Sequence, residues 1–441
     1  MTDLDTSEAA TGTGNRPRPR AVLPALCATQ ITSWGIVYYA FPVLNTRITA
    51  DTGWSATATT GAFSGALIVS ALAGIPIGRI LDRRGPRAVM TTGSLLGVIA
   101  VLALAHAPNL AVFTAAWLLA GLAMASTFYQ PAFAAVTRWW GKDSVRALTI
   151  VTLAGGLAST AFAPLTAALA EEFGWRTTYT VLAVILAVVT IPAHALALRA
   201  PWPPAPTHHT SQAPSNRAVT RSRPFLLLTA ALTLNGFAMY AVVIALVPLL
   251  LERGASPTQA AWALGLGGAG QTLGRTLYAT LTRYTGVTAR TVTLIAAGGA
   301  TTMALAAVPG PYTLLLLLSL LAGMVRGNLT LLQATAVTDR WGTTHYGRLS
   351  GLLAAPATLA SAVAPFAGAA LAGTLGGYPG LFTTLALAST AAAALALGGT
   401  PSRPLERAPE PGCPVNDARL MPLRDRGRPP GAVRPPERQP P

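Results

Sequence analysis

Residues 78–87 read GRILDRRGPR and lie between two long apolar runs, so a short link carries five charged side chains. Basic side chains resist crossing a bilayer, and a cluster of them between two spans holds the link on the cytoplasmic side. Gly78 and Gly85 allow the chain to turn sharply and the flanking helices to approach closely. The link therefore predicts two membrane-spanning helices that are joined on the cytoplasmic face.

The composition indicates a polytopic membrane protein. Hydrophobic residues make up 52% of the 441 residues and charged residues only 10%, more apolar surface than a soluble core can bury. Runs of about 20 apolar residues are read as transmembrane helices. They predict an all-α fold with twelve spans, at residues 22–44, 58–79, 88–107, 109–134, 147–170, 177–199, 225–251, 257–281, 289–308, 312–336, 349–373 and 378–398.

The basic residues are distributed as this topology requires. An even number of spans places both termini on one side, and Lys and Arg collect on the cytoplasmic side. Of the 31 Lys and Arg residues, 27 belong to the tails and links of one face, whereas Arg47, Arg176 and Arg253 belong to the other. Arg275 is counted with the link after the eighth span, because we expect it to reach the interface there. The pattern predicts an integral, multi-pass protein of the plasma membrane with both termini cytoplasmic.

The charge and the cysteines limit the possible partners. The net charge of +16 reflects orientation and contact with anionic membrane lipid rather than nucleic acid, because no folded basic domain is visible. Cys27 and Cys413 suggest neither a disulfide nor metal-ligand spacing. A nucleotide loop, paired acids and a metal cluster are also missing from the sequence. We therefore expect no enzyme activity, no metal and no cofactor.

An internal repeat predicts two pseudo-symmetric six-helix bundles. The residues AVT and WG at 135–141 recur at 336–342, an offset of 201 that also relates Tyr39 to Tyr240. Proline-rich segments predict the connector and a disordered tail. The expected organisation is a cytoplasmic tail at 1–20, a bundle at 21–199, a cytoplasmic connector at 200–223, a bundle at 224–399 and a cytoplasmic tail at 400–441.

The charged link resembles the signature of the major facilitator superfamily, which reads Gly, three residues, Asp, Arg or Lys, one residue, Gly and two basic residues. The matching residues are Gly78, Asp82, Arg83, Gly85 and Arg87, whereas Pro86 replaces one basic position. The resemblance implies two parallel six-helix halves with a substrate site between them. It also implies a cytoplasmic lock between the halves, in which Asp82 takes the place of the acidic residue.

Arg326 is predicted to lie near the middle of the tenth span. A charge at that depth is unfavourable unless it faces a cavity or a partner, and all fifteen acidic residues lie in tails, loops or span ends. The unpaired cation predicts that Arg326 binds the carboxylate or another negative group of a substrate. The alternative is that it bonds to backbone carbonyls, to Asn328 or Gln333, or to Asp339.

The first span carries a stripe of polar and aromatic residues. Gln30, Trp34 and Tyr38 are spaced by four residues and share one face of a helix. Such a face lines a small-molecule cavity or anchors helix contacts and the membrane interface. Further substrate-binding candidates of the same type are Tyr129, Gln130, Asn235, Tyr240 and Gln271.

Together these features predict a secondary active or facilitative transporter that moves a small solute, such as an organic anion, by alternating access. Residues 30–44 and 53–81 are similar to bacterial members of the monocarboxylate and oxalate/formate group. The alternative is an exporter of drugs or toxic metabolites, although APLTAA at residues 163–168 lacks the glycines of the family's drug antiporters. The spans carry no central carboxylate for proton transfer, so the coupling ion is left open.

The predicted topology can be tested by cysteine labelling. In a variant with Cys27 and Cys413 replaced by Ser, a cysteine at Arg47 should react with a membrane-impermeant maleimide added to intact cells. A cysteine at Arg83 serves as the control and should react only after the cells are permeabilised. Labelling of Arg47→Cys from the cytoplasmic side alone would overturn the topology.

Overall fold

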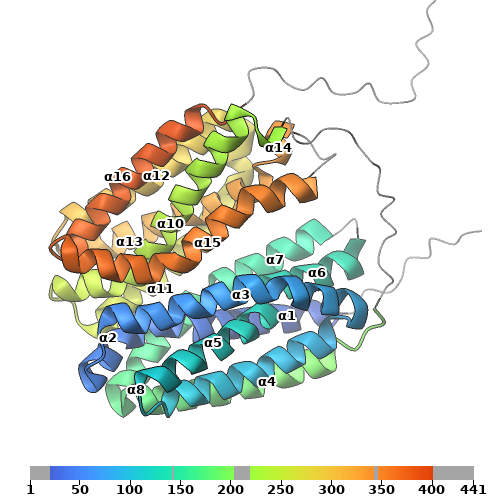
Figure 1. Cartoon of the computed structure of the whole chain (residues 1–441), viewed down its shortest axis with the longest axis vertical. Coiled ribbons are helices and arrows are strands. Elements are labelled where there is room, and N and C mark those ends of the chain that lie inside the picture. The colour runs from blue at the N-terminus through green and yellow to red at the C-terminus, as the bar shows by residue number, and fades with distance from the viewer. Residues whose placement is uncertain (1–19, 142–143, 203–218, 342–345, 401–441) are drawn as a thin grey trace, which may run out of the picture. The chain divides into compact units, whose positions relative to one another are not determined.

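The structure is a computed structural model that describes residues 20–141, 144–202, 219–341 and 346–400. The predicted tails, apart from residues 20 and 400, and most of the connector lie outside these residues. The first half contains the helices α1 (Val22–Trp34), η1 (Gly35–Tyr39), α2 (Ala40–Thr52), α3 (Ala56–Arg84), α4 (Pro86–Ala105), α5 (Leu110–Thr127), α6 (Tyr129–Trp140), α7 (Ser144–Gly156), α8 (Ala158–Pro192) and η3 (Ala193–Ala197). These helices are blue to green in Figure 1.

The second half is yellow-green to red in Figure 1. Its helices are α10 (Arg223–Glu252), α11 (Pro257–Tyr284), α12 (Val287–Ala307), α13 (Tyr312–Thr335), α14 (Thr338–Trp341), α15 (Tyr346–Thr374) and α16 (Tyr378–Leu397). Within this half α11 packs against α13, α10 against α15 and α12 against α16. In the first half α5 packs against both α3 and α4, and α4 packs against α8.

The all-α membrane fold predicted from the sequence is confirmed. Among the described residues, eight helices are long and apolar enough to cross a membrane. One of them, Arg146–Ala197, supplies two crossings, because Gly174 takes a φ of 72° and reverses the chain there. The remaining crossings are α11, α12 and the first span, which is made of α1, η1 and α2. The twelve spans therefore form two six-helix halves.

The charged link is shorter than predicted. The second and third spans were expected to end at residue 79 and to begin at residue 88, but α3 continues to Arg84 and α4 begins at Pro86. Gly85 alone separates them, with a φ of 76° that favours glycine. Pro86 then starts α4 at the first helical position, where its fixed φ suits the helix and its missing N–H has no cost.

The bundle has a basic end and an opposite end. The basic end is the one at which α3, α6 and α11 end, at Arg84, Trp140 and Tyr284. The opposite end is the one at which α2 and α10 end, at Thr52 and Glu252.

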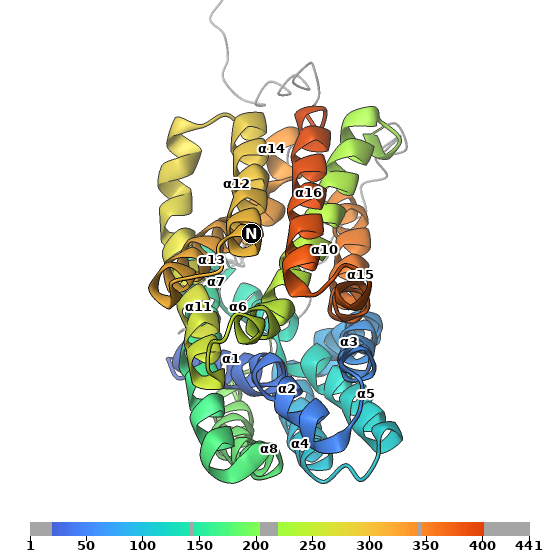
Figure 2. The ribbon, with the colours of Figure 1, turned by 90° about the vertical axis from the view of Figure 1, so that its left-hand side faces the viewer.

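The halves contact each other through α3 with α15, which lie side by side in Figures 1 and 2, and through α8 with α11, which adjoin in Figure 2. Near the opposite end the hydroxyl of Thr258 donates to the carboxylate of Glu171 at 2.8 Å. Deeper in the structure Thr160 donates to the Gly265 carbonyl at 2.9 Å. The Phe366 amide donates to Ser64 at 3.1 Å. These bonds hold the halves together toward the opposite end.

Four glycines bring α11 and α13 into backbone contact. A Cβ atom added at Gly270, Gly274, Gly323 or Gly327 would lie within 3.0 Å of backbone atoms of the other helix. Small residues at such positions allow membrane helices to approach closely, and van der Waals packing then holds the pair together. The contact fixes the relative positions of the long side chains that these two helices carry.

The Gly274→Ala variant should therefore unfold at a lower temperature than the wild type. Its new methyl group would overlap the Met324 backbone, and overpacking of this kind costs about 1–3 kcal/mol. Gly351→Ala on α15 is the matched control, because nothing lies within 4 Å of a Cβ added there. Thermal unfolding of the purified variants in detergent provides the measurement. Equal melting temperatures for the two variants would contradict the packing argument.

Candidate functional site

Three spans of the first half are interrupted at a similar depth. The first span contains the π-helical turn η1, the fourth breaks at Phe128, and the fifth breaks at Leu157. At about 1.5 Å per residue, each interruption lies roughly 18–20 Å from the basic end of its span. Irregular backbone at membrane depth is tolerated where it is buried in protein or lines a cavity. The interruptions therefore mark the level of a candidate site.

Gln30 supports the break in the fourth span. Its Nε2 atom donates to the Thr127 carbonyl at 2.6 Å, across the interface between α1 and α5. The side chain is fully buried and does not line the two large cavities described below. Gln30 thus satisfies a carbonyl that the end of α5 leaves without a helical partner.

Aromatic side chains surround this break. The Trp34 ring stacks on Phe128 with ring centroids 4.1 Å apart, and lies 5.1 Å from the Tyr129 ring. Tyr38 lies 6.5 Å from Tyr240, which belongs to α10 of the second half. The Nε1 atom of Trp34 and the hydroxyl of Tyr38 are buried and have no hydrogen-bond partner among the described residues. Two hydrogen-bond donors are therefore free beside the break.

Two cavities adjoin this aromatic cluster. The arginine cavity, of about 250 Å³, lies between the halves and is lined by Arg275 and Arg326, among others. The α3–α15 cavity, of about 310 Å³, is lined by residues of α3 and α15 and by Gln130 and Gln333. The aromatic residues lining both cavities are Trp34, Tyr38, Tyr129 and Tyr240.

Arg326 is an unpaired cation on the wall of the arginine cavity. Its Nε and Nη2 atoms are buried without a hydrogen-bond partner among the described residues. Two of the alternative partners do not bond to it: the Oδ1 atom of Asn328 has no hydrogen-bond partner among the described residues, and Asp339 accepts from Arg290 at 2.5 Å. The third, Gln333, lines the α3–α15 cavity. The guanidinium group is therefore available to a ligand.

Arg275 corrects one prediction. It was expected to reach the interface at the cytoplasmic end of the eighth span, but about 13 Å of helix separate it from Tyr284. Its side chain lines the arginine cavity, and Nη1 donates to the Thr152 carbonyl on α7 of the other half. The i, i+4 spacing of Gln271 and Arg275 on one helical face is the sequence signal that could have revealed this position.

The remaining predicted site residues fall into different places. Tyr240 and Gln271 line the arginine cavity, and Gln130 lines the α3–α15 cavity. Asn235 lies instead beside Arg326 in a small pocket of about 40 Å³ within the second half. Within the described residues, no group of three or more His, Cys, Asp or Glu side chains could hold a metal ion.

The predicted lock residues form contacts within the first half. Asp82 accepts from Arg138 of α6 at 2.9 Å, and the Arg138 guanidinium lies 4.4 Å from the centroid of the Trp202 ring. Trp202 in turn donates to the Asp82 carbonyl at 3.1 Å, and its ring would meet a Cβ added at Gly85. Arg87 donates to the Ala195 carbonyl at 2.9 Å. Arg83 is exposed, and nothing lies within 4 Å of a Cβ added at Gly78.

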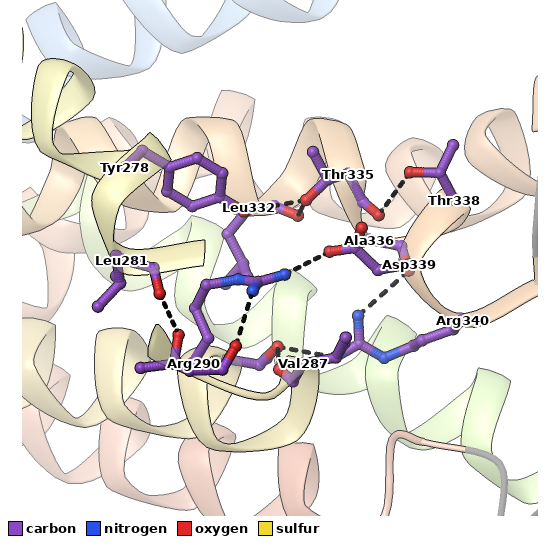
Figure 3. A network of polar contacts seen from close by, with 12 residues as sticks. Tyr278, Leu281, Val287, Arg290, Leu332, Thr335, Ala336, Thr338, Asp339 and Arg340 are labelled. Carbon is purple, nitrogen blue, oxygen red and sulfur yellow. Dashed lines mark hydrogen bonds and ion pairs between the residues drawn. The ribbon is translucent and has the colours of Figure 1, made fainter. Parts of the chain in front are cut away.

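A second charged network occupies the basic end of the other half (Figure 3). Arg290 is only 5% exposed and donates to Asp339 at 2.5 Å. Arg340 donates to the Thr291 hydroxyl at 2.7 Å and to the Gly399 carbonyl at 2.9 Å. Burial lowers the pKa of Arg340 to about 10, which Asp339 opposes and Arg290 reinforces. The side chain therefore stays protonated at neutral pH and holds α12, α14 and the end of α16 together.

Comparisons with known proteins agree with this architecture. The family model described as Major Facilitator Superfamily matches residues 26–252 and 226–433. The chain is 27% identical over 277 residues to monocarboxylate transporter 13 of Rattus norvegicus, covering 61% of this chain and 63% of that protein. It is 24% identical over 136 residues to the uncharacterized MFS-type transporter YcxA of Bacillus subtilis (strain 168), covering 31% and 33%. The matches thus span less than two thirds of these relatives.

Solved structures show the same fold. A bacterial homolog of the human lysosomal transporter Spinster, in an inward-facing and occupied conformation, has a TM-score of 0.64 at 17% identity, covering 88% of this chain and 95% of that chain. A mutant of the nucleoside transporter NupG has a TM-score of 0.71 at 14% identity, covering 86% and 99%. At these identities the likeness concerns the fold alone.

Proposed function

Because the chain belongs to the Major Facilitator Superfamily, whose members transport small solutes through the membrane, we propose that this multi-pass membrane protein carries a small organic anion by alternating access. The plasma membrane is its proposed location, with the basic end and both termini on the cytoplasmic side. Transport is secondary active or facilitative, since the chain carries no recognised nucleotide loop.

The unpaired Arg326 carries this proposal. Two of its donor atoms are buried without a partner in the described structure, and a desolvated charge of this kind is strongly unfavourable until an opposite charge compensates it. Arg275 lines the same cavity, whereas the described lining includes no acidic residue. A carboxylate matches the planar fork of a guanidinium and accepts two parallel hydrogen bonds. The cavity thus favours a carboxylate over a neutral or cationic solute.

The alternative function, export of drugs, has one observation in its favour. Four aromatic residues shared by both cavities provide a surface on which an apolar drug could pack. The two arginines argue against cationic drugs, because like charges repel strongly in a site of low dielectric constant. A carboxylate substrate also agrees with the name of the rat relative, monocarboxylate transporter 13.

The contacts between the halves support an inward-facing interpretation. They are formed toward the opposite end and down to Arg275 and Thr152. At the basic end the described ion pairs, Asp82 with Arg138 and Arg290 with Asp339, are each formed within one half. We therefore place solute exchange with the cytoplasm at the basic end in this state, and assign the lock to contacts that form when that end closes.

Replacing Arg326 with Gln should weaken butyrate binding far more than binding of the neutral isostere butyramide. A charge-assisted contact contributes about 1.5–3 kcal/mol, which corresponds to roughly a tenfold to hundredfold change in affinity. Arg326→Lys should be milder, because it keeps the charge and loses only the planar fork. Binding and uptake are measured with the reconstituted protein, and Arg221→Gln, at an exposed position of the basic end, is the matched control.

If a folded Arg326→Gln protein binds butyrate and butyramide with equally weakened affinity, Arg326 belongs to helix packing. That result would favour the alternative function, export of drugs. Drug resistance of cells that express the chain would then support it.

The lock proposal concerns Asp82. The Asp82→Asn variant should transport butyrate more slowly and bind it with unchanged affinity, because Asp82 lies outside both cavities and pairs with Arg138. Arg138→Gln should have a similar effect, and the double variant should be no slower than either single variant, since both changes break the same pair. Unchanged initial uptake rates in Asp82→Asn proteoliposomes would rule out the lock role.

A further inference from the structure

The break in the fourth span exposes the amino terminus of α6. Phe128 is extended, with a ψ of −161°, and its amide still donates to the Met124 carbonyl at 3.0 Å. The next two amides, of Tyr129 and Gln130, have no acceptor within their helix, and Pro131 has no N–H. No side chain caps this end of α6. The amino terminus of a helix attracts negative groups, because its free amides and its dipole both favour them.

A buried side chain independently indicates a ligand at this place. Tyr38 is 2% exposed, yet its hydroxyl has no hydrogen-bond partner among the described residues. It lines both cavities together with Tyr129, and one of them together with Phe128 and Gln130. A buried hydroxyl without a partner is unfavourable, because it has lost its hydrogen bonds to water without replacing them. An oxygen acceptor bound beside the α6 terminus would remove that penalty.

Local structure holds these donors in place. Tyr38 lies within the π-helical turn η1, and such turns are frequent at functional sites. One turn before Trp34, Gln30 bonds to the Thr127 carbonyl and so ties α1 to the broken end of α5. The stacking of Trp34 on Phe128 joins the same two segments. Contacts from the first span therefore hold the break in the fourth span in place.

We propose that the amides of Tyr129 and Gln130 and the hydroxyl of Tyr38 form a second anion subsite, and that the transported solute is a small dicarboxylate. This inference rests on the proposed function: one carboxylate binds Arg326, and the other binds the amino terminus of α6. Tyr38, Tyr129 and Arg326 line the same cavity of about 250 Å³, so one solute in that cavity can reach all three.

Charge balance favours two carboxylates over one. Arg275 and Arg326 each bring a permanent positive charge to the cavity lining, and the α6 terminus adds a partial positive charge. A single carboxylate leaves part of this charge uncompensated in a desolvated site, whereas a dicarboxylate neutralises it. The first half supplies the helix terminus and the second half supplies the arginines, so the solute is held by both halves.

The experiment compares succinate with butyrate, which has the same chain length and lacks the second carboxylate. The purified full-length protein should bind succinate at least about tenfold more tightly, as expected for one further charge-assisted contact. Tyr38→Phe removes the hydroxyl and keeps the ring. It should reduce this preference by about tenfold, because succinate loses the contact of its second carboxylate and so more affinity than butyrate.

A matched pair of variants tests the backbone amide. Tyr129→Pro removes the N–H, and Tyr129→Ala keeps it while losing the same ring. Proline suits this first helical position, because the preceding Phe128 is already extended. Succinate affinity should be lower in Tyr129→Pro than in Tyr129→Ala, with no such difference for butyrate. If Tyr129→Pro does not fold, the result for Tyr38→Phe decides.

The outcomes separate the two proposals. The second subsite is wrong if the wild type binds succinate and butyrate with equal affinity, or if Tyr38→Phe weakens the binding of both equally. Binding of butyrate that depends on Arg326 would still support the proposed function as an anion carrier. Failure of the wild type to bind either carboxylate overturns the proposed function and the subsite together.

Discussion

The absence of water in the bilayer core is the constraint on which this structure depends. Every backbone N–H and C=O group at that depth needs a partner within the protein, so a span is helical unless it faces a cavity or a protein neighbour. The interruptions at η1, Phe128 and Leu157 obey this rule. Gln30 satisfies the Thr127 carbonyl beside one of them, and the aromatic rings of both cavities cover the same region. The proposed solute site lies at these interruptions of the regular helices.

The two halves contribute different chemistry to that site despite their repeated sequence. The first half supplies broken helices, whereas the corresponding helices α10, α13 and α15 are continuous across the cavity level. The second half supplies the permanent charges, and the glycine contact between α11 and α13 places Arg275 and Arg326 on one cavity. The repeat offset of 201 also relates Arg138 to Asp339. The basic member of the ion pair in the first half therefore corresponds to the acidic member of the ion pair in the second half. Pseudo-symmetry therefore preserves the architecture and leaves the charges free to differ.

Structural features that depend only on the solvation of side chains could be predicted from the sequence. Apolar runs indicate spans, and the lack of an acidic partner indicates that Arg326 faces a cavity. Arg275 was misplaced because distance from a predicted helix end does not reveal which way a long side chain points. Helical spacing predicted that Gln30 and Tyr38 share one face, but Tyr38 lies within the π-helical turn η1, which rotates it relative to Gln30. The break at Phe128 could have been predicted, because Pro131 has no N–H for the Thr127 carbonyl and its ring clashes with that carbonyl.

If the solute is an anion as proposed, Arg275 links its charge to the movement of the halves. Its bond to the Thr152 carbonyl is a contact between the halves at the wall of the arginine cavity, which both residues line. Separation of α7 from α11 breaks that bond and leaves a second guanidinium group uncompensated at membrane depth, which is strongly unfavourable. An anion in the cavity offsets this penalty, because it can accept the hydrogen bond that Thr152 releases. A ligand shifts a conformational equilibrium only through its different affinity for the two states, and Arg275 provides such a difference for an anion but not for a neutral solute.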